Sequence, residues 1–161
     1  MGAHVDEVWK HARIETSSED EFTHATVRGK HEVLMDEGVD LPFGGSDEGP
    51  SAVDLLVTSL LACQVSVLQQ CFEKARIEEY EIEAEATIDN RQEGEIPEEM
   101  PENTAKRVRH IVVDLDATVP EELEPRAQRC LDVYDDGCIV GQSILEGIDY
   151  STDARLTVSG D

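Results

Sequence analysis

Cys63 is the side chain in this sequence that is best placed to do chemistry. It lies near the middle of residues 55–72, which contain no charged residue, in a chain of 161 residues of which 31% are charged. A cysteine acts as a nucleophile in its thiolate form, and burial among apolar groups raises the pKa of a thiol. A reactive Cys63 therefore needs a positively charged neighbour from another part of the chain. The alternative is that Cys63 only packs in the core, as many cysteines do.

The other three cysteines are Cys71, Cys130 and Cys138. None belongs to a Cys-x-x-Cys pair, and no His or Cys residues have the spacing of a zinc site, so we expect neither a metal nor a cofactor. Cys63 and Cys71 would lie about 12 Å apart along one helix, too far for a disulfide. We interpret Cys71 and Cys130 as free thiols in the core.

A long helix must position Cys63. Ser51 is a suitable N-cap, and Asp54 follows it at capping-box spacing, which predicts a helix that begins there and continues to about Ala75. Apolar residues cover nearly its whole circumference, which is typical of a helix inside a domain or a multimer. Polar residues interrupt the run and both flanks are acidic, so we do not expect a membrane span.

The rest of the chain predicts an α+β fold in a single domain, residues 1–161. Alternating apolar and polar residues, or short apolar runs, predict strands at residues 11–16, 22–28, 31–35, 80–88, 108–118 and 149–158, the first three as an antiparallel meander. A second helix is expected from Pro120, with Leu123, Ala127, Leu131 and Tyr134 on one face. A short segment, residues 139–145, follows Cys138. Residues 1–8 are expected to fray, and residues 36–48 and 91–106 to form loops, the latter acidic.

The chain is strongly acidic, with 37 Asp and Glu against 13 Lys and Arg and a net charge of −24. Such a surface repels nucleic acid and anionic membranes, so we expect neither as a partner. It also repels itself unless salt screens it, which favours a halophile's protein over an ordinary acidic one. The first residues lack the basic flank and apolar core of a signal peptide, so a cytoplasmic location is expected.

Two motifs resemble those of the osmotically inducible protein C and organic hydroperoxide resistance (OsmC/Ohr) family. The first comprises GG at 44–45, GPSAVDLL at 49–56 and SLLAC at 59–63; the second is CIVGQSILEGI at 138–148. The resemblance covers about residues 20–157. It implies an OsmC-like fold in which antiparallel sheets wrap around a long central helix in an intertwined homodimer, with sites at the subunit interface.

The resemblance also implies the chemistry. Cys63 occupies the peroxidatic position and Cys138 the resolving one, which implies a peroxidase that reduces organic hydroperoxides and is regenerated by an external dithiol. Arg28 or Arg13 would activate Cys63, and Asp54, about 13 Å from it along the helix, would take part only across a dimer interface. Asp54 stands where related proteins often have Glu, and Ile139 replaces a usual proline. A dimeric ligand-binding or redox-sensing stress protein without peroxidase turnover is the alternative.

Overall fold

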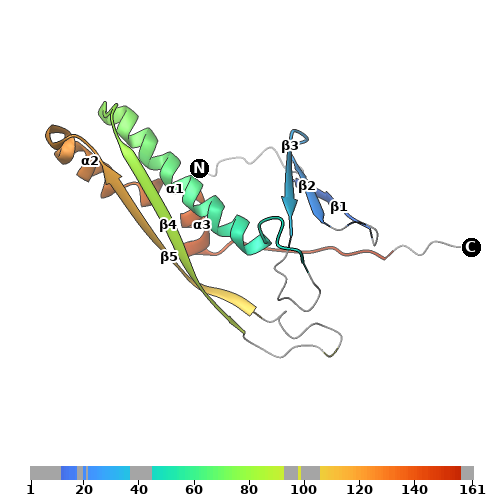
Figure 1. Ribbon diagram of the computed structural model, residues 1–161. Helices are drawn as coiled ribbons and strands as arrows, with labels where there is room; N and C mark the ends of the chain where they lie inside the picture. The colour runs from blue at the N-terminus through green and yellow to red at the C-terminus, as the bar shows by residue number, and fades with distance from the viewer. Residues whose placement is uncertain are drawn as a thin grey trace, which may run out of the picture. The chain divides into compact units, whose positions relative to one another are not determined.

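The computed structural model describes residues 12–17, 20, 22–36, 45–92, 98 and 106–156 (Figure 1). The chain forms two compact units, one of residues 1–58 and 85–114, the other of residues 59–84 and 115–161. Helix α1 (Ala52–Ala75) and strands β4 (Glu81–Gln92) and β5 (Lys106–Thr118) contribute residues to both units. The mixture of antiparallel sheets and helices confirms the predicted α+β class.

The first unit contains a three-stranded sheet in the order β1-β2-β3. Its strands β1 (Ala12–Glu15), β2 (Thr23–Val27) and β3 (His31–Met35) pair antiparallel, which confirms the predicted meander. The register sets Ala25 opposite Ile14 on one side and opposite Val33 on the other, and Ala25 is buried. Successive side chains of a strand point to opposite faces of the sheet, so an alternating sequence was sufficient to predict these strands.

Arg28 does not lie on a strand, as the alternating pattern predicted, but in the turn between β2 and β3. Arg28 has a φ of 50° and Gly29 a φ of 65°, and Lys30 donates a backbone hydrogen bond of 3.1 Å to Val27. Two consecutive residues with positive φ give a turn whose twist matches that of the paired strands. The demands of this turn override the alternation that would have continued the strand.

Asp36 organises the segment that leads into α1. Its carboxylate accepts hydrogen bonds from the Ser46 nitrogen at 3.0 Å, the Ser46 hydroxyl at 2.8 Å and the Glu48 nitrogen at 3.1 Å. The Asp36 nitrogen donates to the Pro50 carbonyl at 3.2 Å, and a Cβ added at Gly49 would overlap the Leu34 side chain. Part of the predicted loop at residues 36–48 lies outside the described residues, but its end is therefore fixed against β3.

Helix α1 begins as the sequence predicts. The Ser51 hydroxyl accepts a hydrogen bond of 3.2 Å from the Asp54 nitrogen, and the Asp54 carboxylate accepts one of 2.8 Å from the Ser51 nitrogen. This reciprocal capping box satisfies two backbone donors that the first turn leaves free. Within this chain, however, α1 is buried along one narrow stripe only, made of Leu60, Gln64, Leu68 and Phe72.

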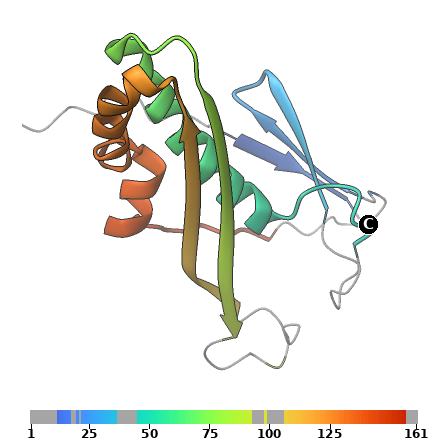
Figure 2. The ribbon, with the colours of Figure 1, turned by 60° about the vertical axis from the view of Figure 1, so that its left-hand side comes forward.

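The core of the second unit lies where the C-terminal half of α1 meets helix α2 (Glu124–Leu131) and the adjoining parts of β4 and β5 (Figure 2). Its buried residues are Leu68, Phe72, Ile77, Ala127 and Cys130. Glu81, Glu83 and Glu85 of β4 are exposed while Ile82 packs on the core, as the alternation predicted. Figure 2 shows β4 and β5 running in opposite directions.

The second predicted helix is shorter than expected and is followed by further helical segments. A 3₁₀ turn (Glu121–Leu123) precedes α2, and Pro125 lies in the first turn of α2, where its missing N–H costs nothing. The chain then forms a second 3₁₀ turn (Asp135–Gly137) and helix α3 (Ile139–Glu146). Tyr134 therefore lies beyond the end of α2, although it still packs on the core.

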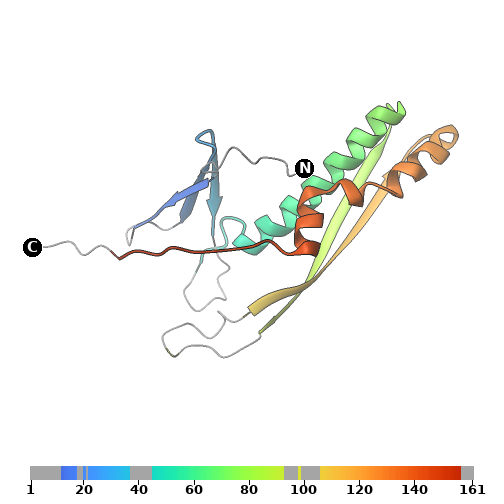
Figure 3. The ribbon, with the colours of Figure 1, turned by 180° about the vertical axis from the view of Figure 1, so that it is seen from behind.

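The predicted strand at residues 149–158 is wrong for the part that the structure describes. Residues 147–156 have no regular secondary structure, and Figure 3 shows them as an extended segment after α3. Ile148, Tyr150 and Leu156 are 73%, 87% and 91% exposed. An alternating sequence becomes a strand only when it forms hydrogen bonds with a neighbouring strand, and residues 147–156 pair with no strand among the described residues.

Most of the predicted loop at residues 91–106 lies outside the described residues. At its ends, β4 extends to Gln92 and β5 begins at Lys106, so both strands are longer than the pattern predicted. The predicted frayed start, residues 1–8, also lies outside the described part.

Candidate functional site

The thiols of Cys63 and Cys138 lie close enough to interact within the second unit, since Cys63 is one of the groups that raise the pKa of Cys138. Cys63 comes from α1, and Cys138 is the N-cap of α3. Both are free cysteines; Cys63 is half-buried, whereas Cys138 is completely buried. Two neighbouring thiols can be oxidised to a disulfide, and of these two only Cys63 is partly exposed to a reagent from outside.

Cys138 is held by the backbone on both of its sides. Its nitrogen donates a hydrogen bond of 3.0 Å to the Asp135 carbonyl, and its sulfur accepts one of 3.2 Å from the Gly141 nitrogen. Gly141 is buried, and a Cβ at this position would lie 3.3 Å from the Cys138 sulfur. The Gly at 141 thus lets the first turn of α3 close around the thiol.

The surroundings of Cys138 keep it protonated. Burial is the main cause that raises its pKa, followed by the hydrogen bond with Cys63; the nearby charges of Cys63 and Asp135 act in the same direction. The hydrogen bond from Gly141 lowers the pKa but does not outweigh these effects. At neutral pH Cys138 is therefore a neutral thiol that can donate a proton.

Gln64 and Asp135 join the two elements that carry the cysteines. The Gln64 side-chain nitrogen donates a hydrogen bond of 3.1 Å to the Asp135 carboxylate. Gln64 is 7% exposed, and its side-chain oxygen is buried without a hydrogen-bond partner among the described residues. A buried amide oxygen without a partner costs free energy of folding. The Gln64 oxygen is therefore available to accept a hydrogen bond from a group that enters the site.

Sequence analysis missed both of these residues. Gln64 follows Cys63 directly and occupies a place in the buried stripe between Leu60 and Leu68, and a polar residue in an apolar stripe is a signal that could have found it. Asp135 belongs to the sequence Asp-Asp-Gly at 135–137, which is typical of a turn. Nothing in its local sequence indicates that its side chain turns toward α1.

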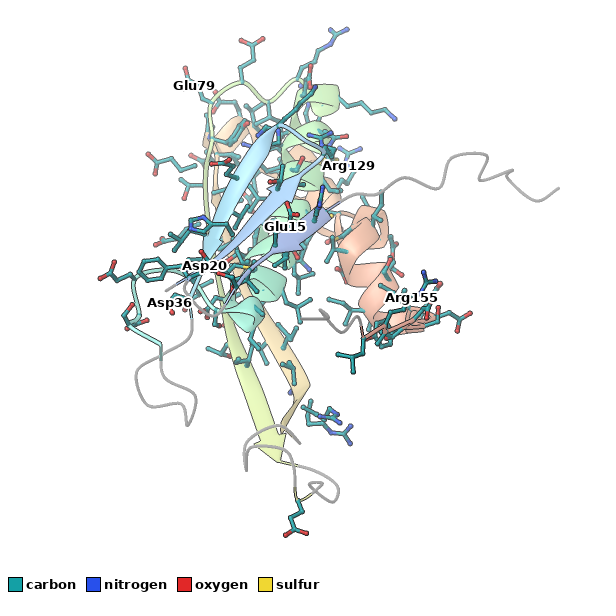
Figure 4. The ribbon with its side chains drawn as sticks, turned by 90° about the vertical axis from the view of Figure 1, so that its right-hand side faces the viewer. Glu15, Asp20, Asp36, Glu79, Arg129 and Arg155 are labelled. Carbon is teal, nitrogen blue, oxygen red and sulfur yellow. A yellow bond between two sulfur atoms is a disulfide. The ribbon has the colours of Figure 1, made fainter. Side chains whose placement is uncertain are left out.

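The remaining predicted site residues, Arg28, Arg13 and Asp54, belong to the first unit. Arg28 is an exposed turn residue. Arg13 is exposed and forms an ion pair of 2.6 Å with Glu15, which lies on β1 (Figure 4). Hydrogen bonds from Ser51 lower the pKa of Asp54, so this carboxylate is charged and occupied by the helix cap. The parts of these three residues in catalysis stay predictions.

The sequence matches the model of a known protein family. Residues 45–153 match the model for OsmC-like proteins. The matched range contains Cys63, Cys138 and the whole of helix α1. The chain belongs to the OsmC-like family. A comparison with curated proteins found no match.

Solved structures of OsmC-like proteins share the fold. An OsmC-like protein from Mycoplasma pneumoniae is 13% identical, with a TM-score of 0.61 over 87% of this chain and 89% of its own. An organic hydroperoxide resistance protein from Elizabethkingia anophelis is 19% identical, with a TM-score of 0.54 over 86% and 89%. A third, an organic hydroperoxide resistance protein OsmC and predicted redox protein from Legionella pneumophila, is 14% identical, with a TM-score of 0.54 over 83% and 86%. The OsmC-like fold expected from the two motifs is thus confirmed.

Membership of the OsmC-like family also bears on α1. Among the described residues, α1 is the one helix long and apolar enough to cross a membrane, with a mean hydropathy of 1.6. A helix in the core of a domain can have the same length and composition, and α1 packs on the core of the second unit along its buried stripe. The OsmC-like fold therefore explains this helix without a bilayer.

Proposed function

We propose that this OsmC-like protein is a cytoplasmic thiol peroxidase that reduces organic hydroperoxides and protects against oxidative stress. The observation that supports it best is the contact between the Cys63 and Cys138 thiols, which come from distant parts of the sequence. A packing role for either cysteine would not require the other. The family contains proteins named for resistance to organic hydroperoxides, which agrees with this chemistry.

The unequal burial of the two thiols supports the proposed division of roles between them. In the proposed cycle the Cys63 thiolate attacks the distal oxygen of the hydroperoxide, the O–O bond breaks, and the alkoxide leaves as the alcohol after taking a proton. Cys63 becomes a sulfenic acid. Cys138 then attacks the Cys63 sulfur, and the Cys138 proton leaves with the sulfenic hydroxyl as water. Two thiols of an external dithiol reduce the resulting disulfide by exchange.

Apolar surface around the site favours a hydrophobic substrate and a second copy of the chain. Ile139, next to Cys138, is 78% exposed, and Leu145 on the same helix is 74% exposed. Ile148, Tyr150 and Leu156 in the following segment are exposed as well, and exposed apolar side chains that lie together mark interaction sites. We propose that a homodimer covers these side chains, with the site at the interface and Arg28 next to Cys63.

A ligand-binding or redox-sensing dimer without turnover is the second candidate, and the neutral state of Cys138 favours it in one respect. A buried, protonated resolving thiol slows attack on a sulfenic acid, because the thiolate is the stronger nucleophile. A sensor needs one oxidation and a slow return, whereas a peroxidase needs repeated cycles.

The test is consumption of cumene hydroperoxide by the full chain in molar salt, with dithiothreitol as the reductant. We expect steady turnover by the wild type and none by Cys63→Ser; in a separate reaction without dithiothreitol, Cys138→Ser should consume one equivalent of hydroperoxide and leave Cys63 as a sulfenic acid. Ser66→Ala, an exposed change on α1, is the control and should retain full activity.

Mass spectrometry after one equivalent of hydroperoxide completes the test. If the Cys63–Cys138 disulfide forms but no steady turnover is observed, the redox-sensing function is supported and the peroxidase function is rejected. If Cys63 remained a free thiol, or formed a link with Cys130, both proposals would be wrong.

A further inference from the structure

A second pair of sulfurs lies at the far end of α1. Cys71 on α1 and Cys130 on α2 form a disulfide, with 5.7 Å between their Cα atoms. The prediction that both are free core thiols is therefore wrong. It failed because the spacing of the two cysteines in the sequence does not reveal that α2 packs against α1. The disulfide shares no residue with the Cys63–Cys138 pair.

The disulfide opens into a pocket with an unusual charge. The pocket has a volume of about 460 Å³ and is lined by Cys71, Lys74, Ala75, Arg126, Arg129 and Cys130. Three of its six lining residues are cationic and none is acidic. In a chain with 37 acidic and 13 basic residues, three cations without a carboxylate among them make a local field opposite in sign to that of the rest of the protein.

The arginines are held by backbone groups rather than by acids. Arg126 donates a hydrogen bond of 3.4 Å to the Ala75 carbonyl, and Arg129, labelled in Figure 4, donates one of 3.0 Å to the Pro125 carbonyl. Within the part of the chain that the structure describes, neither arginine forms an ion pair with a carboxylate, and nor does Lys74. Their charges are therefore available to an anion from outside.

The two sulfurs differ in access as well. Cys71 is half-buried, whereas Cys130 is only 2% exposed and belongs to the core of the second unit. A thiolate entering the pocket would reach the Cys71 sulfur, and the Cys130 sulfur would leave. Nearby guanidinium groups stabilise a departing thiolate, which makes it a better leaving group.

We propose that this pocket is a second thiol–disulfide exchange site, which takes small thiols that carry carboxylate groups. The carboxylates bind Lys74, Arg126 and Arg129, while the ligand thiolate attacks Cys71 and forms a mixed disulfide as Cys130 leaves and takes a proton. A second thiol of the same class attacks the ligand sulfur of the mixed disulfide and releases Cys71. The sum is reduction of the protein disulfide by two electrons and oxidation of two ligand thiols to their disulfide.

The experiment compares three thiols on the oxidised full chain: mercaptosuccinate, which is anionic, 2-mercaptoethanol, which is neutral, and cysteamine, which is cationic. The rate of opening is followed by alkylation of Cys71 and Cys130 and mass spectrometry. Each rate constant is expressed per thiolate and divided by that for a short unstructured peptide disulfide of no net charge. The salt concentration is the lowest at which circular dichroism shows the native fold.

The sign of the result separates the proposal from an ordinary structural disulfide. A chain of charge −24 should repel mercaptosuccinate, so without an anion site this thiol would be the slowest of the three. With the site, we expect it to be faster than 2-mercaptoethanol by about tenfold, and the advantage to shrink as salt is raised. A ratio of one or less, or a disulfide that no thiol opens in the native state, would overturn the proposal.

Variants localise the effect. Arg129→Gln should remove most of the preference for mercaptosuccinate, and Lys74→Gln combined with Arg126→Gln and Arg129→Gln should abolish it. Arg76→Gln removes the same single charge close to α1 but outside the pocket, and should leave the preference unchanged. A preference that survives the triple change would contradict the proposal, and Arg129→Gln alone decides it if the triple variant does not fold.

The outcome does not depend on the peroxidase. Cys63→Ser lacks the proposed peroxidatic thiol but retains the whole pocket, so its Cys71–Cys130 disulfide should exchange as in the wild type. If turnover of hydroperoxide fails while selective exchange is observed, only the proposed function is wrong, and the reverse pattern rejects only the second site.

Discussion

The side chain of Gln64 donates a hydrogen bond of 3.1 Å to the carboxylate of Asp135, and so links the helix of Cys63 to the turn that precedes Cys138. This bond spans 71 positions in the sequence. It lies beside the two thiols, because Gln64 adjoins Cys63 and the Asp135 carbonyl binds the Cys138 nitrogen. A polar contact inside an otherwise apolar stripe thus joins the two segments that carry the sulfurs.

Replacing Gln64 with leucine should separate positioning from stability. Leucine extends the stripe of Leu60 and Leu68 and removes the unpaired amide oxygen, so thermal stability should stay equal or rise. We expect the Cys63–Cys138 disulfide to form at least about tenfold more slowly after one equivalent of hydroperoxide, because small displacements of reacting atoms are costly. Gln69→Leu, an exposed change on α1, is the control. An unchanged rate in Gln64→Leu would show that the contact does not position the thiols.

Unfolding at alkaline pH should reveal the buried thiol. The pKa of Cys138 is raised above its ordinary value of 9.0, chiefly by burial. Between these two values the unfolded chain binds fewer protons than the folded one, so the free energy of unfolding must fall as the pH rises. Stability from this group is complete below about pH 9 and is lost as the pH passes the raised value. Denaturant titrations at a series of pH values measure the loss.

Two variants assign the alkaline loss to its cause. Cys138→Ser should remove the contribution of the thiol, leaving that of Tyr134, whose pKa is also raised, mainly by burial. Asp135→Asn should reduce the loss, because the Asp135 charge raises the pKa of both groups. An alkaline loss in Cys138→Ser as large as in the wild type would contradict the raised pKa of the thiol.

The capping box should be separable from catalysis. Ser51→Ala removes the N-cap of α1 and should lower stability by about 1 kcal/mol in reversible unfolding while leaving the Asp54 carboxylate in place. If Asp54 is only a cap residue, Asp54→Ala and Ser51→Ala should have similar effects on stability and neither should change turnover. Loss of turnover in Asp54→Ala alone would support the predicted part of Asp54 in the site.

Arg28 can be tested without disturbing its turn. Asparagine tolerates the left-handed conformation that Arg28 adopts, so Arg28→Asn should fold normally. If Arg28 activates Cys63, kcat/KM for cumene hydroperoxide should fall by about 100-fold, the typical cost of removing a group that stabilises developing negative charge. Arg13→Gln breaks only an exposed ion pair with Glu15 and should change it little. The opposite result would assign the activating role to Arg13.

Local sequence was sufficient where neighbours along the chain decide the structure. Helix α1 begins and ends where the sequence predicts because the Ser51 cap and a long uncharged run act within one element. The β1-β2-β3 meander was also predictable, since its strands are consecutive and alternate cleanly. Arg28 is the exception, because it lies in a turn with positive φ although the alternating pattern predicted that it would be part of a strand.

Contacts between residues that are distant in the sequence could not be predicted from local patterns. The family motifs pointed to Cys63 and Cys138, but not to Gln64 and Asp135, whose contact exists only because the turn before α3 packs against α1. The Cys71–Cys130 disulfide was missed for the same reason. Residues 149–156 show the converse, because they have the pattern of a strand but pair with no strand in the described part of the chain.

The α+β class, the long capped helix, the high content of acidic residues and the family resemblance could all be inferred from the amino-acid sequence, because they depend on residue types and on contacts within a few turns or strands. Which sulfurs meet, how deeply each is buried and which charges surround it became clear only from the folded chain. Those properties arise from side chains that meet only after α1, α2 and α3 have packed, and no short-range pattern encodes them.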